Sequence, residues 1–563
     1  FGVPAEWIDD VRRATEDTLF DVIEHLPQEA QEALLKLAVG EQPDISEQKP
    51  ETDDPFAHPD AKRRFRVLTN VEELKRALEF PWEKWAVFLH PAQEDLVQRS
   101  YSGPTRVSGS AGTGKTIVAL HRAVHLSKQN PDARILLTTF SEALANALKR
   151  KLRNLTASEP VVGERITVKP ISAVGYDLYA ERFGQPNIAS AALVQSLLRE
   201  ASSSVEDNKF SHQFLLNEWT DVVDAWQLKT WEDYRDVSRL GRRTRIGGKQ
   251  REVLWKIFGQ VRAGLEKRNT VSWSDVFGRV TEDLGSTKQR PFGYAVVDEA
   301  QDLSVAKSRF LAALAGDEDN GLFFAGDLGQ RIFQQPFSWR ALGLDVRGRS
   351  YTLRINYRTS HQIRVQADRL LPAHVSDVDG NSENRRGTVS LFDGPPPSVL
   401  VASTIDDEAS AVAEWINTRI AEGVGPHEIG IFVRSDDELK RARKALKATG
   451  QSTVELGDKV EVCKDSIALA TMHYAKGLEF RCAVVMACDD EVIPLQSRIE
   501  AVTDESDLKE VYETERHLLY VACTRARDHL LVSAVDPASE FLDDFSTDVS
   551  FHENDVQGQK PVL

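Results

Sequence analysis

Residues 109–116 read GSAGTGKT, and this stretch decides the fold class of the chain. Its first glycine is followed by four residues and then by a glycine, Lys115 and Thr116. This spacing lets backbone N–H groups surround a phosphate chain while the lysine reaches the terminal phosphates and the hydroxyl reaches Mg²⁺. The apolar run at 105–108 and the helix-like run at 117–120 predict a strand, a phosphate-binding loop and a helix.

An acidic motif lies further along the chain. Residues 298–302 read DEAQD and directly follow the apolar run 294–297. A strand that ends in two acidic residues can supply one carboxylate for a metal ion and a second one to activate water. Together with the P-loop, this motif predicts an α/β protein that hydrolyses a nucleoside triphosphate.

The composition is that of an ordinary globular protein, with 41% hydrophobic and 28% charged residues among 563. No uninterrupted apolar run approaches the roughly 18 residues of a membrane span, and no signal peptide is visible. The four cysteines show no metal-binding spacing and predict reduced thiols. We therefore expect a cytoplasmic protein without a membrane partner. Because the chain begins at Phe1 and its methionines are Met472 and Met486, we expect the natural start to lie upstream.

The net charge of −17 is concentrated at the two ends of the chain. Residues 1–60 hold 16 acidic and 4 basic residues, and residues 531–563 hold 7 acidic residues and one lysine. The middle carries a net charge of +1. Since affinity for phosphates depends on local patches, the overall acidity does not exclude a nucleic-acid partner. The acidic N-terminal segment is a candidate surface for a protein partner.

The order of the patterns predicts two α/β domains and a helical insertion. From about 65, strand-like runs at 134–139 and 165–169 alternate with helix-like runs at 142–155 and 171–182, and the alternation then pauses over a mainly helical stretch. Strand-like runs resume at 294–297 and 321–326 and continue, with one near 467–471, until about 535. Nucleotide would bind in the crevice between the domains, at the carboxyl ends of parallel strands. The expected boundaries are an acidic helical segment at 1–39, a linker at 40–64, a first P-loop domain at 65–185 and 290–345, an insertion at 186–289, a second α/β domain at 346–535 and an acidic tail at 536–563.

The second half of the chain adds groups suited to a γ-phosphate. Gln330 follows the predicted strand 321–326 and could sense that phosphate or orient water. Arg358 belongs to the segment NYR, and Arg525 lies in a predicted helix over 519–527. Phosphoryl transfer needs cations near the charge that develops on the γ-phosphate, so both arginines are candidate arginine fingers.

In this order, the motifs resemble those of superfamily 1A helicases of the UvrD/Rep/PcrA family. Residues 90–93 (HPAQ) are similar to the family's adenine-reading glutamine motif, and residues 138–148 to its next motif, which contacts single-stranded DNA. Residues 471–480 resemble a later motif between two strands. The resemblance covers roughly 86–184 and 290–533. It implies two RecA-like P-loop NTPase domains, with the helical insertion matching subdomain 1B.

The resemblance implies ATP and Mg²⁺ as the nucleotide and metal. Asp298 would organise Mg²⁺ through water, Glu299 would act as general base, and Gln330 would contact the γ-phosphate with Arg358 and Arg525. The other contacts would come from Gln93 at the adenine edge, Tyr357 at the adenine face, Glu479 at the ribose, and Gly112, Thr113, Gly114, Lys115 and Thr116 at the phosphates and metal.

For DNA, Phe140, His473 and the pair Trp339-Arg340 match family positions that touch or stack on bases. A packed aromatic ring or core histidine is the alternative for each. It is an equal alternative for Trp339, because the family has its Trp-Arg pair only a few residues after the segment that corresponds to 326–330, whereas here residues 334–338 intervene. Within the insertion, residues 239–251 hold six basic residues and no acid. This segment, which includes Arg242, Arg243 and Arg245, is either a phosphate contact or a solvated loop.

The chain departs from the family in one place. In typical members, subdomain 2B lies between segments that correspond to residues 429–435 and to the motif 471–480. Here only residues 436–470 separate these two segments, which leaves no room for that subdomain. We therefore expect translocation and ATP hydrolysis with limited unwinding. The opening residues 1–7 and the linker also resemble a bacterial subgroup in which a RelE-like module can precede the helicase, and we expect that module to have been removed from this chain.

The leading expectation is a monomeric, bacterial, ATP-dependent 3′→5′ translocase or helicase that acts on single-stranded or tailed duplex DNA, as in DNA repair. Two alternatives stay open. An RNA-directed translocase would hold bases by the same stacking, because no residue reports on the 2′-hydroxyl. A nucleotide-switched regulatory protein would bind partners through its acidic N-terminal segment.

Overall fold

A computed structural model of the chain describes residues 8–15, 18–19, 34, 37, 89, 91–237, 246–287, 290–315, 318–327, 330, 337–372, 374–376, 379, 382–384, 387–390, 392–457, 465–500 and 505–545. The chain divides into two compact units, residues 1–94 and 95–563. The first unit contains helix α1 (Ile8–Arg13) and the beginning of α6 (Pro91–Gln98). Most of the predicted N-terminal segment and the whole predicted linker at 40–64 lie outside the described residues.

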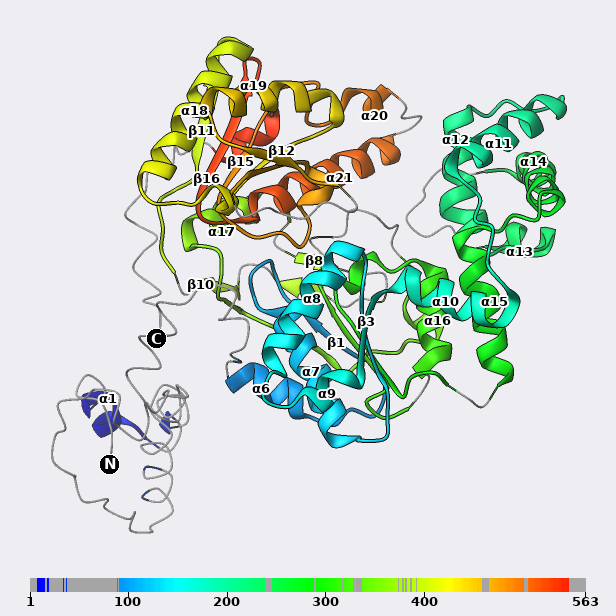
Figure 1. The fold of residues 1–563 in the computed structure, drawn as a ribbon, viewed down its shortest axis with the longest axis horizontal. Coiled ribbons are helices and arrows are strands. Elements are labelled where there is room, and N and C mark those ends of the chain that lie inside the picture. The colour runs from blue at the N-terminus through cyan, green and yellow to red at the C-terminus, as the bar shows by residue number, and fades with distance from the viewer. Residues whose placement is uncertain are drawn as a thin grey trace. The chain divides into compact units, whose positions relative to one another are not determined.

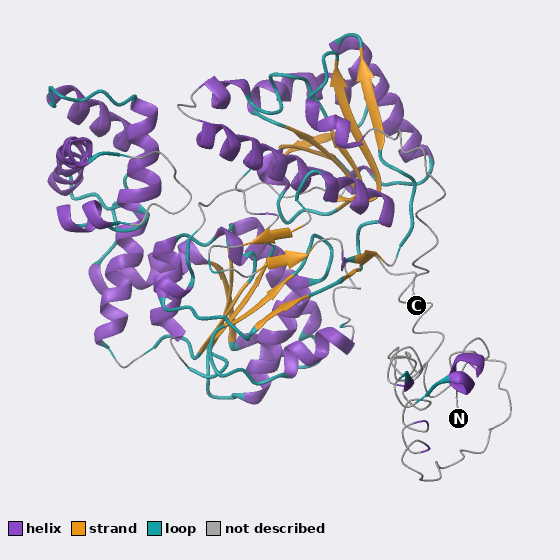
Figure 2. Ribbon diagram, turned by 180° about the vertical axis from the view of Figure 1, so that it is seen from behind, coloured by secondary structure: helices purple, strands orange, loops and turns teal. Residues whose placement is uncertain are grey.

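The second unit contains two six-stranded parallel sheets, each with helices on both faces (Figure 1 and Figure 2). The first sheet has the strand order β3-β2-β4-β5-β1-β6. Strands β1, β2 and β5 are buried along their whole length, as expected of a parallel sheet that is covered on both faces. The strands of this sheet are β1 (Thr105–Ser108), β2 (Ile135–Thr139), β3 (Ile166–Pro170), β4 (Tyr294–Val297), β5 (Leu322–Gly326) and β6 (Ser350–Thr352).

Helices connect the strands of the first sheet in the predicted order. The strand predicted at 134–139 and the helix predicted at 142–155 are confirmed by β2 and α8. Helix α8 begins after Ser141, whose hydroxyl accepts a hydrogen bond from the backbone N–H of Leu144 and caps the helix. The helices are α7 (Lys115–Gln129), α8 (Glu142–Leu155), α9 (Pro160–Glu164), α10 (Ile171–Phe183) and α16 (Val305–Ala315), with 3₁₀ turns η4 (Ala300–Asp302) and η6 (Arg340–Leu342).

The helical insertion has a hydrophobic core of its own. Trp219, Tyr234 and Phe258 lie in this core, and the ring centroids of Trp219 and Phe258 are 5.9 Å apart. Helix α15 runs beside α10 and α16 instead (Figure 1), and its Phe277 packs against Phe310 with ring centroids 5.3 Å apart. The insertion comprises α11 (Ala191–Ser204), α12 (His212–Glu218), the π-helical turn η3 (Trp219–Asp224), α13 (Trp231–Asp236), α14 (Gly248–Lys267) and α15 (Trp273–Ser286).

The second sheet has the strand order β11-β16-β15-β12-β14-β13. Its strands are β11 (Ser398–Ala402), β12 (Ile429–Val433), β13 (Thr453–Glu455), β14 (Ile467–Thr471), β15 (Phe480–Val485) and β16 (Ala526–Val535). Its helices and turns are α17 (His361–Arg369), α18 (Ile405–Ala421), η8 (Pro426–Glu428), η9 (Asp436–Glu438), α19 (Leu439–Thr449), η10 (Met472–Ala475), α20 (Gln496–Glu500) and α21 (Glu505–Cys523).

Two short ribbons lie between the sheets in sequence. Strand β7 (Ile355–Asn356) pairs with β10 (Val389–Ser390) in parallel, and β8 (His374–Ser376) pairs with β9 (Ser382–Asn384) antiparallel. Between β12 and β14, the described part of the chain forms only η9, α19 and β13, as the short spacing predicts.

The first part of the predicted acidic tail is packed. Residues 540–545 form the 3₁₀ helix η11 (Glu540–Phe545), in which Phe541 and Leu542 are buried in the core of the second sheet's domain. The Phe541 ring lies 5.9 Å from the ring of Tyr512 and beneath the guanidinium of Arg516. Two apolar residues therefore hold this segment against the domain although its neighbours are acidic.

Candidate functional site

Glycines shape the loop between β1 and α7. Gly112 and Gly114 have φ angles of 83° and 85°, a left-handed conformation that glycine adopts without strain. A Cβ atom on Gly112 would lie 2.4 Å from Oδ1 of Asn356, so no side chain fits there. The hydroxyl of Thr113 donates to the carbonyl of Ser110 at 2.9 Å and closes the turn. The predicted phosphate-binding loop therefore has the tight backbone that such a loop requires.

Lys115 is the first residue of α7 and is buried. Its ammonium group donates hydrogen bonds to the carbonyls of Gly109 at 2.7 Å and Ser110 at 2.9 Å. It also lies 3.8 Å from Oδ2 of Asp327, which follows β5. The lysine is thus held at the phosphate-binding loop by carbonyl groups and a carboxylate.

Asp298 is the first of the two acidic residues at the end of β4. Its backbone N–H donates to the carbonyl of Thr138 at 2.8 Å, which fixes the end of β4 beside β2. Burial and then the charge of Glu299 raise the pKa of Asp298, while a hydrogen bond from Thr116 and the charge of Lys115 oppose the shift. A buried carboxylate beside a hydroxyl, with a second carboxylate next to it, is an environment that a divalent cation would stabilise.

Glu299 has a different electrostatic environment from its neighbour. Its φ of 57° and ψ of 41° are left-handed, which is uncommon for a residue with a side chain. Gln301 donates a hydrogen bond to its Oε2 at 2.6 Å, and Nζ of Lys476 lies 3.5 Å from the same oxygen. Burial works to raise the pKa of Glu299, but Lys476, Lys115, Gln301 and Arg525 outweigh it and hold the pKa below its ordinary value. Glu299 therefore stays ionised although its side chain is only 12% exposed.

Gln330 connects the two α/β domains. Its backbone N–H donates to the carbonyl of Asp327 at 3.0 Å, and its Nε2 donates to Oδ2 of the same residue at 2.8 Å. Its Oε1 accepts a hydrogen bond from Nη2 of Arg525 at 3.3 Å. Gln301 accepts from the backbone N–H of Asp327 at 2.9 Å, so the segments that follow β4 and β5 are also joined.

Two buried arginines of the second domain lie side by side. Arg358 donates from Nη1 to Oε1 of Glu479 at 2.8 Å and from Nη2 to the carbonyl of Thr524 at 3.1 Å. Its Nε is buried and has no hydrogen-bond partner within the described part of the chain. Burial, and then the charge of Arg358, lower the pKa of Arg525 to about 10. Two positive charges placed together in this way suit an anion with several negative charges.

The prediction that Arg525 lies in a helix is wrong. Helix α21 ends at Cys523, and β16 begins at Ala526. Arg525 lies in the short turn between them, where its carbonyl accepts from the backbone N–H of Phe480 at 3.0 Å. The helix ends because Ala526 pairs with Phe480 in the parallel ladder of β15 and β16. The guanidinium donates from Nη2 to Oε1 of Gln330 at 3.3 Å, and its role at the γ-phosphate stays a prediction.

Asn356 joins the phosphate-binding loop to the segment of Arg358, a contact that sequence reasoning missed. Its Nδ2 donates to the carbonyl of Ala111 in the phosphate-binding loop at 2.8 Å. Its Oδ1 accepts from the backbone N–H groups of Arg358 at 2.9 Å and Thr359 at 3.0 Å. A short polar residue between a strand and an arginine could have indicated this, because asparagine often organises a turn.

Lys476 and Asp302 were also missed, although both lie inside motifs that the sequence identified. Nζ of Lys476, from the second domain, forms an ion pair with Oδ2 of Asp302 and donates to the carbonyl of Gln330 at 2.8 Å. Burial raises the pKa of Asp302 to about 6, and Lys476 opposes this shift. The signal was present as a lysine three residues after a histidine in the segment 471–480, but only the fold brings it to the acidic residues.

The predicted adenine contacts are placed as follows. Gln93 lies on α6 and is buried. Tyr357 is partly buried, and burial raises the pKa of its hydroxyl. The backbone N–H of Tyr357 donates to the carbonyl of Gly112 at 2.9 Å, so the backbone of this residue is joined directly to the phosphate-binding loop.

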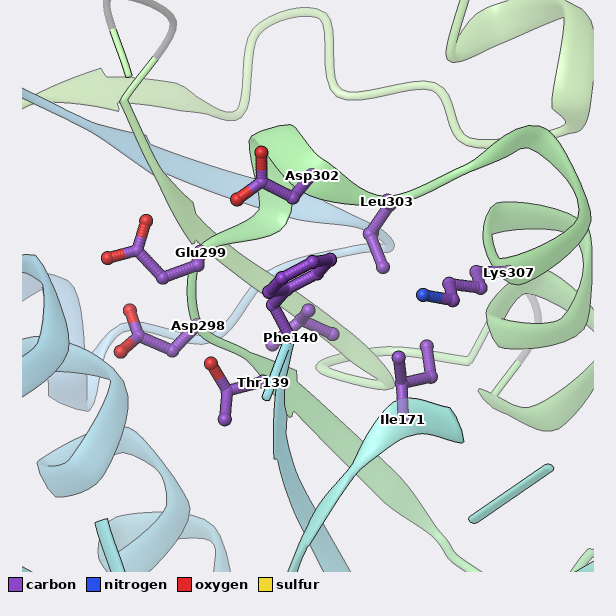
Figure 3. A pocket seen from close by; sticks show the side chains of 9 residues that line it. Thr139, Phe140, Ile171, Asp298, Glu299, Asp302, Leu303 and Lys307 are labelled. Carbon is purple, nitrogen blue, oxygen red and sulfur yellow. The ribbon is translucent and has the colours of Figure 1, made fainter. Parts of the chain in front are cut away.

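The residues predicted to contact DNA fall into different environments. Phe140 is half-buried and lines a small pocket with Asp298, Glu299 and Lys307 (Figure 3). His473 is half-buried, and burial lowers its pKa to about 4.

Trp339 has the environment of a core residue. It is 9% exposed, its ring lies 4.7 Å from Phe324 in an edge-to-face contact, and its backbone N–H donates to Asp379 at 2.7 Å. This packing matches the core alternative for Trp339, whereas the neighbouring Arg340 is exposed. Arg242, Arg243 and Arg245 lie outside the described residues, so the predicted basic contact has no structural description.

The side chains present fit a nucleotide with a bound Mg²⁺. Asp298 and Thr116 offer oxygen atoms, which Mg²⁺ prefers. Lys115 stands at the loop whose Gly112 admits no side chain, and Arg358 and Arg525 lie across from it in the second domain. Within the described residues, none of the helices is both long enough and apolar enough to span a membrane.

Comparisons with known proteins cover both domains. Residues 89–341 match the family model of the UvrD/REP helicase N-terminal domain, and residues 450–536 match that of the UvrD-like helicase C-terminal domain. The chain is 23% identical over 552 residues to the ATP-dependent DNA helicase UvrD2 of Mycobacterium tuberculosis, an alignment that covers 77% of this chain and 76% of that protein.

Two further relatives support the same assignment. DNA helicase IV of Escherichia coli is 23% identical over 496 residues, covering 78% of this chain and 67% of its own length. The ATP-dependent DNA helicase PcrA of Bacillus subtilis is 25% identical over 277 residues, covering 46% of this chain and 34% of its own length. With both family models matched in the two parallel-sheet domains that hold the site, the chain belongs to the UvrD-like helicases of superfamily 1A.

Proposed function

We propose that this chain is an ATP-dependent translocase and helicase that moves 3′→5′ along single-stranded DNA. One observation carries the proposal: Arg525 of the second domain reaches Gln330 of the first at 3.3 Å, so groups from both domains meet at one site. Hydrolysis of nucleotide at such a site changes the contacts between the two domains. Alternating attachment of the two domains to a strand then produces movement.

The described side chains support distinct steps of hydrolysis. Lys115 binds the terminal phosphates, and Asp298 with Thr116 would hold Mg²⁺, which neutralises phosphate charge. Glu299, kept ionised in a buried place, accepts a proton from the attacking water. The charge that develops on the γ-phosphate is stabilised by Arg358 and Arg525, with Gln330 orienting the same group.

The base and sugar of ATP are bound by other groups. Gln93 reads the adenine edge, and Tyr357 stacks on the ring. Glu479 binds the ribose, and its hydrogen bond from Arg358 at 2.8 Å links nucleotide recognition to the arginine. Ribose binding and stabilisation of the γ-phosphate are thereby coupled through the pair of Arg358 and Glu479.

DNA is held by stacking and by charge. Phe140 and His473 contact bases, where each stacked base contributes roughly 1–3 kcal/mol. His473 is neutral at physiological pH because burial lowers its pKa to about 4, so it acts as a ring rather than as a cation. Arg340 and the basic residues between 239 and 251 contact phosphates. The relatives' names, which specify ATP-dependent DNA helicases, support DNA as the strand.

Unwinding is limited in this chain, because the short segment between β12 and β14, whose described residues form η9, α19 and β13, leaves no room for subdomain 2B. A 3′ single-stranded tail is then needed to start. We further propose that the protein works as a monomer in the cytoplasm and that its acidic N-terminal segment binds a protein partner.

One set of assays tests the proposal. ATPase rates are measured without nucleic acid, with single-stranded DNA and with RNA of the same sequence, and unwinding is measured on 3′-tailed, 5′-tailed and blunt duplexes. We expect stimulation by DNA and unwinding from the 3′ tail only. Equal stimulation by RNA would favour the RNA-directed alternative, and nucleotide binding without turnover would favour the regulatory one. Rapid unwinding of blunt duplex would contradict the limit assigned to the missing subdomain.

A further inference from the structure

Lys307 is a charged residue in an unfavourable place. It lies in the first turn of α16, where the helix dipole disfavours a cation. Ser304 caps this turn by accepting from the backbone N–H of Lys307 at 3.4 Å. The side chain is half-buried, and burial lowers its pKa, although the charge of Asp302 opposes this. Both burial and the helix dipole therefore make the ammonium group costly at this position.

The surroundings compensate this cost only in part. Among the residues that the structure describes, the ammonium group of Lys307 makes no hydrogen bond and no ion pair. Its nearest specific contact is the ring of Phe140, whose centroid is 5.5 Å from Nζ. A cation–π contact supplies a modest electrostatic attraction from the face of the ring. That is less than an ion pair with hydrogen bonds would supply to a buried cation.

Phe140 separates this lysine from the acidic residues of the same pocket. Figure 3 shows the ammonium group directed toward the ring, with the carboxylates of Asp298, Glu299 and Asp302 beyond it. Asp302 is already paired with Lys476, which also lies 3.5 Å from Glu299. The positive charge beside Phe140 is therefore available to another anion.

We propose that Lys307 binds a backbone phosphate of the single strand, next to the nucleotide whose base stacks on Phe140. The inference rests on the proposed function and adds a residue to its DNA site. Proteins that hold single strands combine aromatic rings for the bases with cations along the backbone. Lysine serves as a flexible point charge for phosphate. A ring and an ammonium group 5.5 Å apart provide both elements of such a contact.

The experiment compares Lys307→Met and Lys307→Gln with Lys307→Arg, which keeps the charge. Lys509→Met is a matched control, because Lys509 is a 67% exposed lysine on α21. Affinity for a labelled oligothymidylate is measured by fluorescence anisotropy at several salt concentrations. Both neutral variants should lower the slope of log affinity against log salt by about 0.7, the value for one lost single-strand phosphate contact. Lys307→Arg and Lys509→Met should keep the parent slope, and ATPase activity without DNA should not change in any of the four variants.

A second set of affinity measurements distinguishes a phosphate contact of Lys307 from a base contact. On an oligonucleotide with abasic sites the neutral variants should lose the same affinity as on oligothymidylate, whereas Phe140→Leu should lose affinity only on the strand with bases. An effect of Lys307 that vanishes on the abasic strand would overturn the phosphate assignment. A parent-like slope in both neutral variants, or an equal fall of ATPase activity without DNA, would overturn the inference. If the parent protein binds no single strand, the proposed function fails instead.

Discussion

Replacement of Asn356 should disturb the arginine site and the phosphate-binding loop together. Asn356 is fully buried, and its side chain makes hydrogen bonds to the backbone groups of Ala111, Arg358 and Thr359 at 2.8, 2.9 and 3.0 Å. Asn356→Ala leaves all three backbone groups without this partner. Each unsatisfied buried group costs about 1–3 kcal/mol, so the loss of stability should be about 3 kcal/mol or more.

Asn356→Asp is the matched variant, because it keeps the shape and the two accepting bonds. It loses the donated bond and places a carboxylate oxygen against the carbonyl of Ala111. Asn356→Ala should therefore lower kcat by about tenfold or more, since Arg358 loses its fixed turn. Asn356→Asp should keep kcat within about threefold and raise KM for ATP, since only the loop contact is lost.

Steady-state ATPase rates at saturating single-stranded DNA and thermal unfolding measure both effects. Asn417→Ala serves as a control, because Asn417 is an exposed asparagine on α18. Equal loss of kcat in Asn356→Ala and Asn356→Asp, with KM unchanged in both, would refute the reasoning. Unchanged unfolding of Asn356→Ala would show that its three hydrogen bonds carry no net stability.

Four further predictions concern the site and its strand. Glu299→Gln should still bind nucleotide but lose nearly all hydrolysis, and phosphate release at the parent rate would exclude Glu299 as general base. Arg358→Ala and Arg525→Ala should each lower kcat more than they change KM, and strictly additive losses in the double variant would contradict a shared action. Neutralising three basic residues between 239 and 251 should reduce the salt slope of DNA binding by up to about 0.7 per lost contact, whereas an unchanged slope would indicate a solvated loop. Because burial lowers the pKa of His473 to about 4, the unfolded chain takes up a proton below about pH 6.5 that the folded protein does not. The free energy of unfolding should thus fall as pH drops from 6.5 toward 4, and His473→Gln should lessen this fall; an identical pH profile would contradict the shift.

Local patterns were sufficient for much of the fold. The helix predicted at 142–155 coincides with α8, because a capping serine marks its start and apolar spacing continues to Leu155. The strands predicted at 294–297 and 467–471 coincide with β4 and β14, since short apolar runs between polar loops are typical of buried parallel strands. These elements are defined by their own residues, and no distant contact was needed to predict them.

The missed and misplaced residues depend on distant contacts. The turn at Arg525 exists because Ala526 pairs with Phe480, a partner that helical spacing over 519–527 does not reveal. Phe541 is buried by Tyr512 and Arg516 of α21, although composition alone assigns its segment to an acidic tail. Tertiary packing overrides local composition at both places.

The Trp339-Arg340 pair shows a related limit. Both residues lie in a motif-like segment, yet one is buried against Phe324 and the other is exposed. The spacing between Trp339 and the segment around Gln330 could not decide between base stacking and core packing. The environment of the Trp339 ring is set by Phe324 in strand β5 of the first sheet. Family resemblance thus predicts the segment that holds a functional residue more reliably than it predicts which side chain of that segment contacts DNA.

The acidic pair shows why hydrolysis at this site depends on both domains. Asp298 and Glu299 are adjacent in sequence, yet the pKa of the first is raised and that of the second is lowered. The left-handed backbone at Glu299 places its carboxylate 3.5 Å from Lys476, which belongs to the second domain. Separation of the domains would remove that positive charge and let burial raise the pKa of Glu299. The charge of Glu299, the proposed general base, therefore depends in part on Lys476 of the second domain, the same domain that brings Arg525 to Gln330.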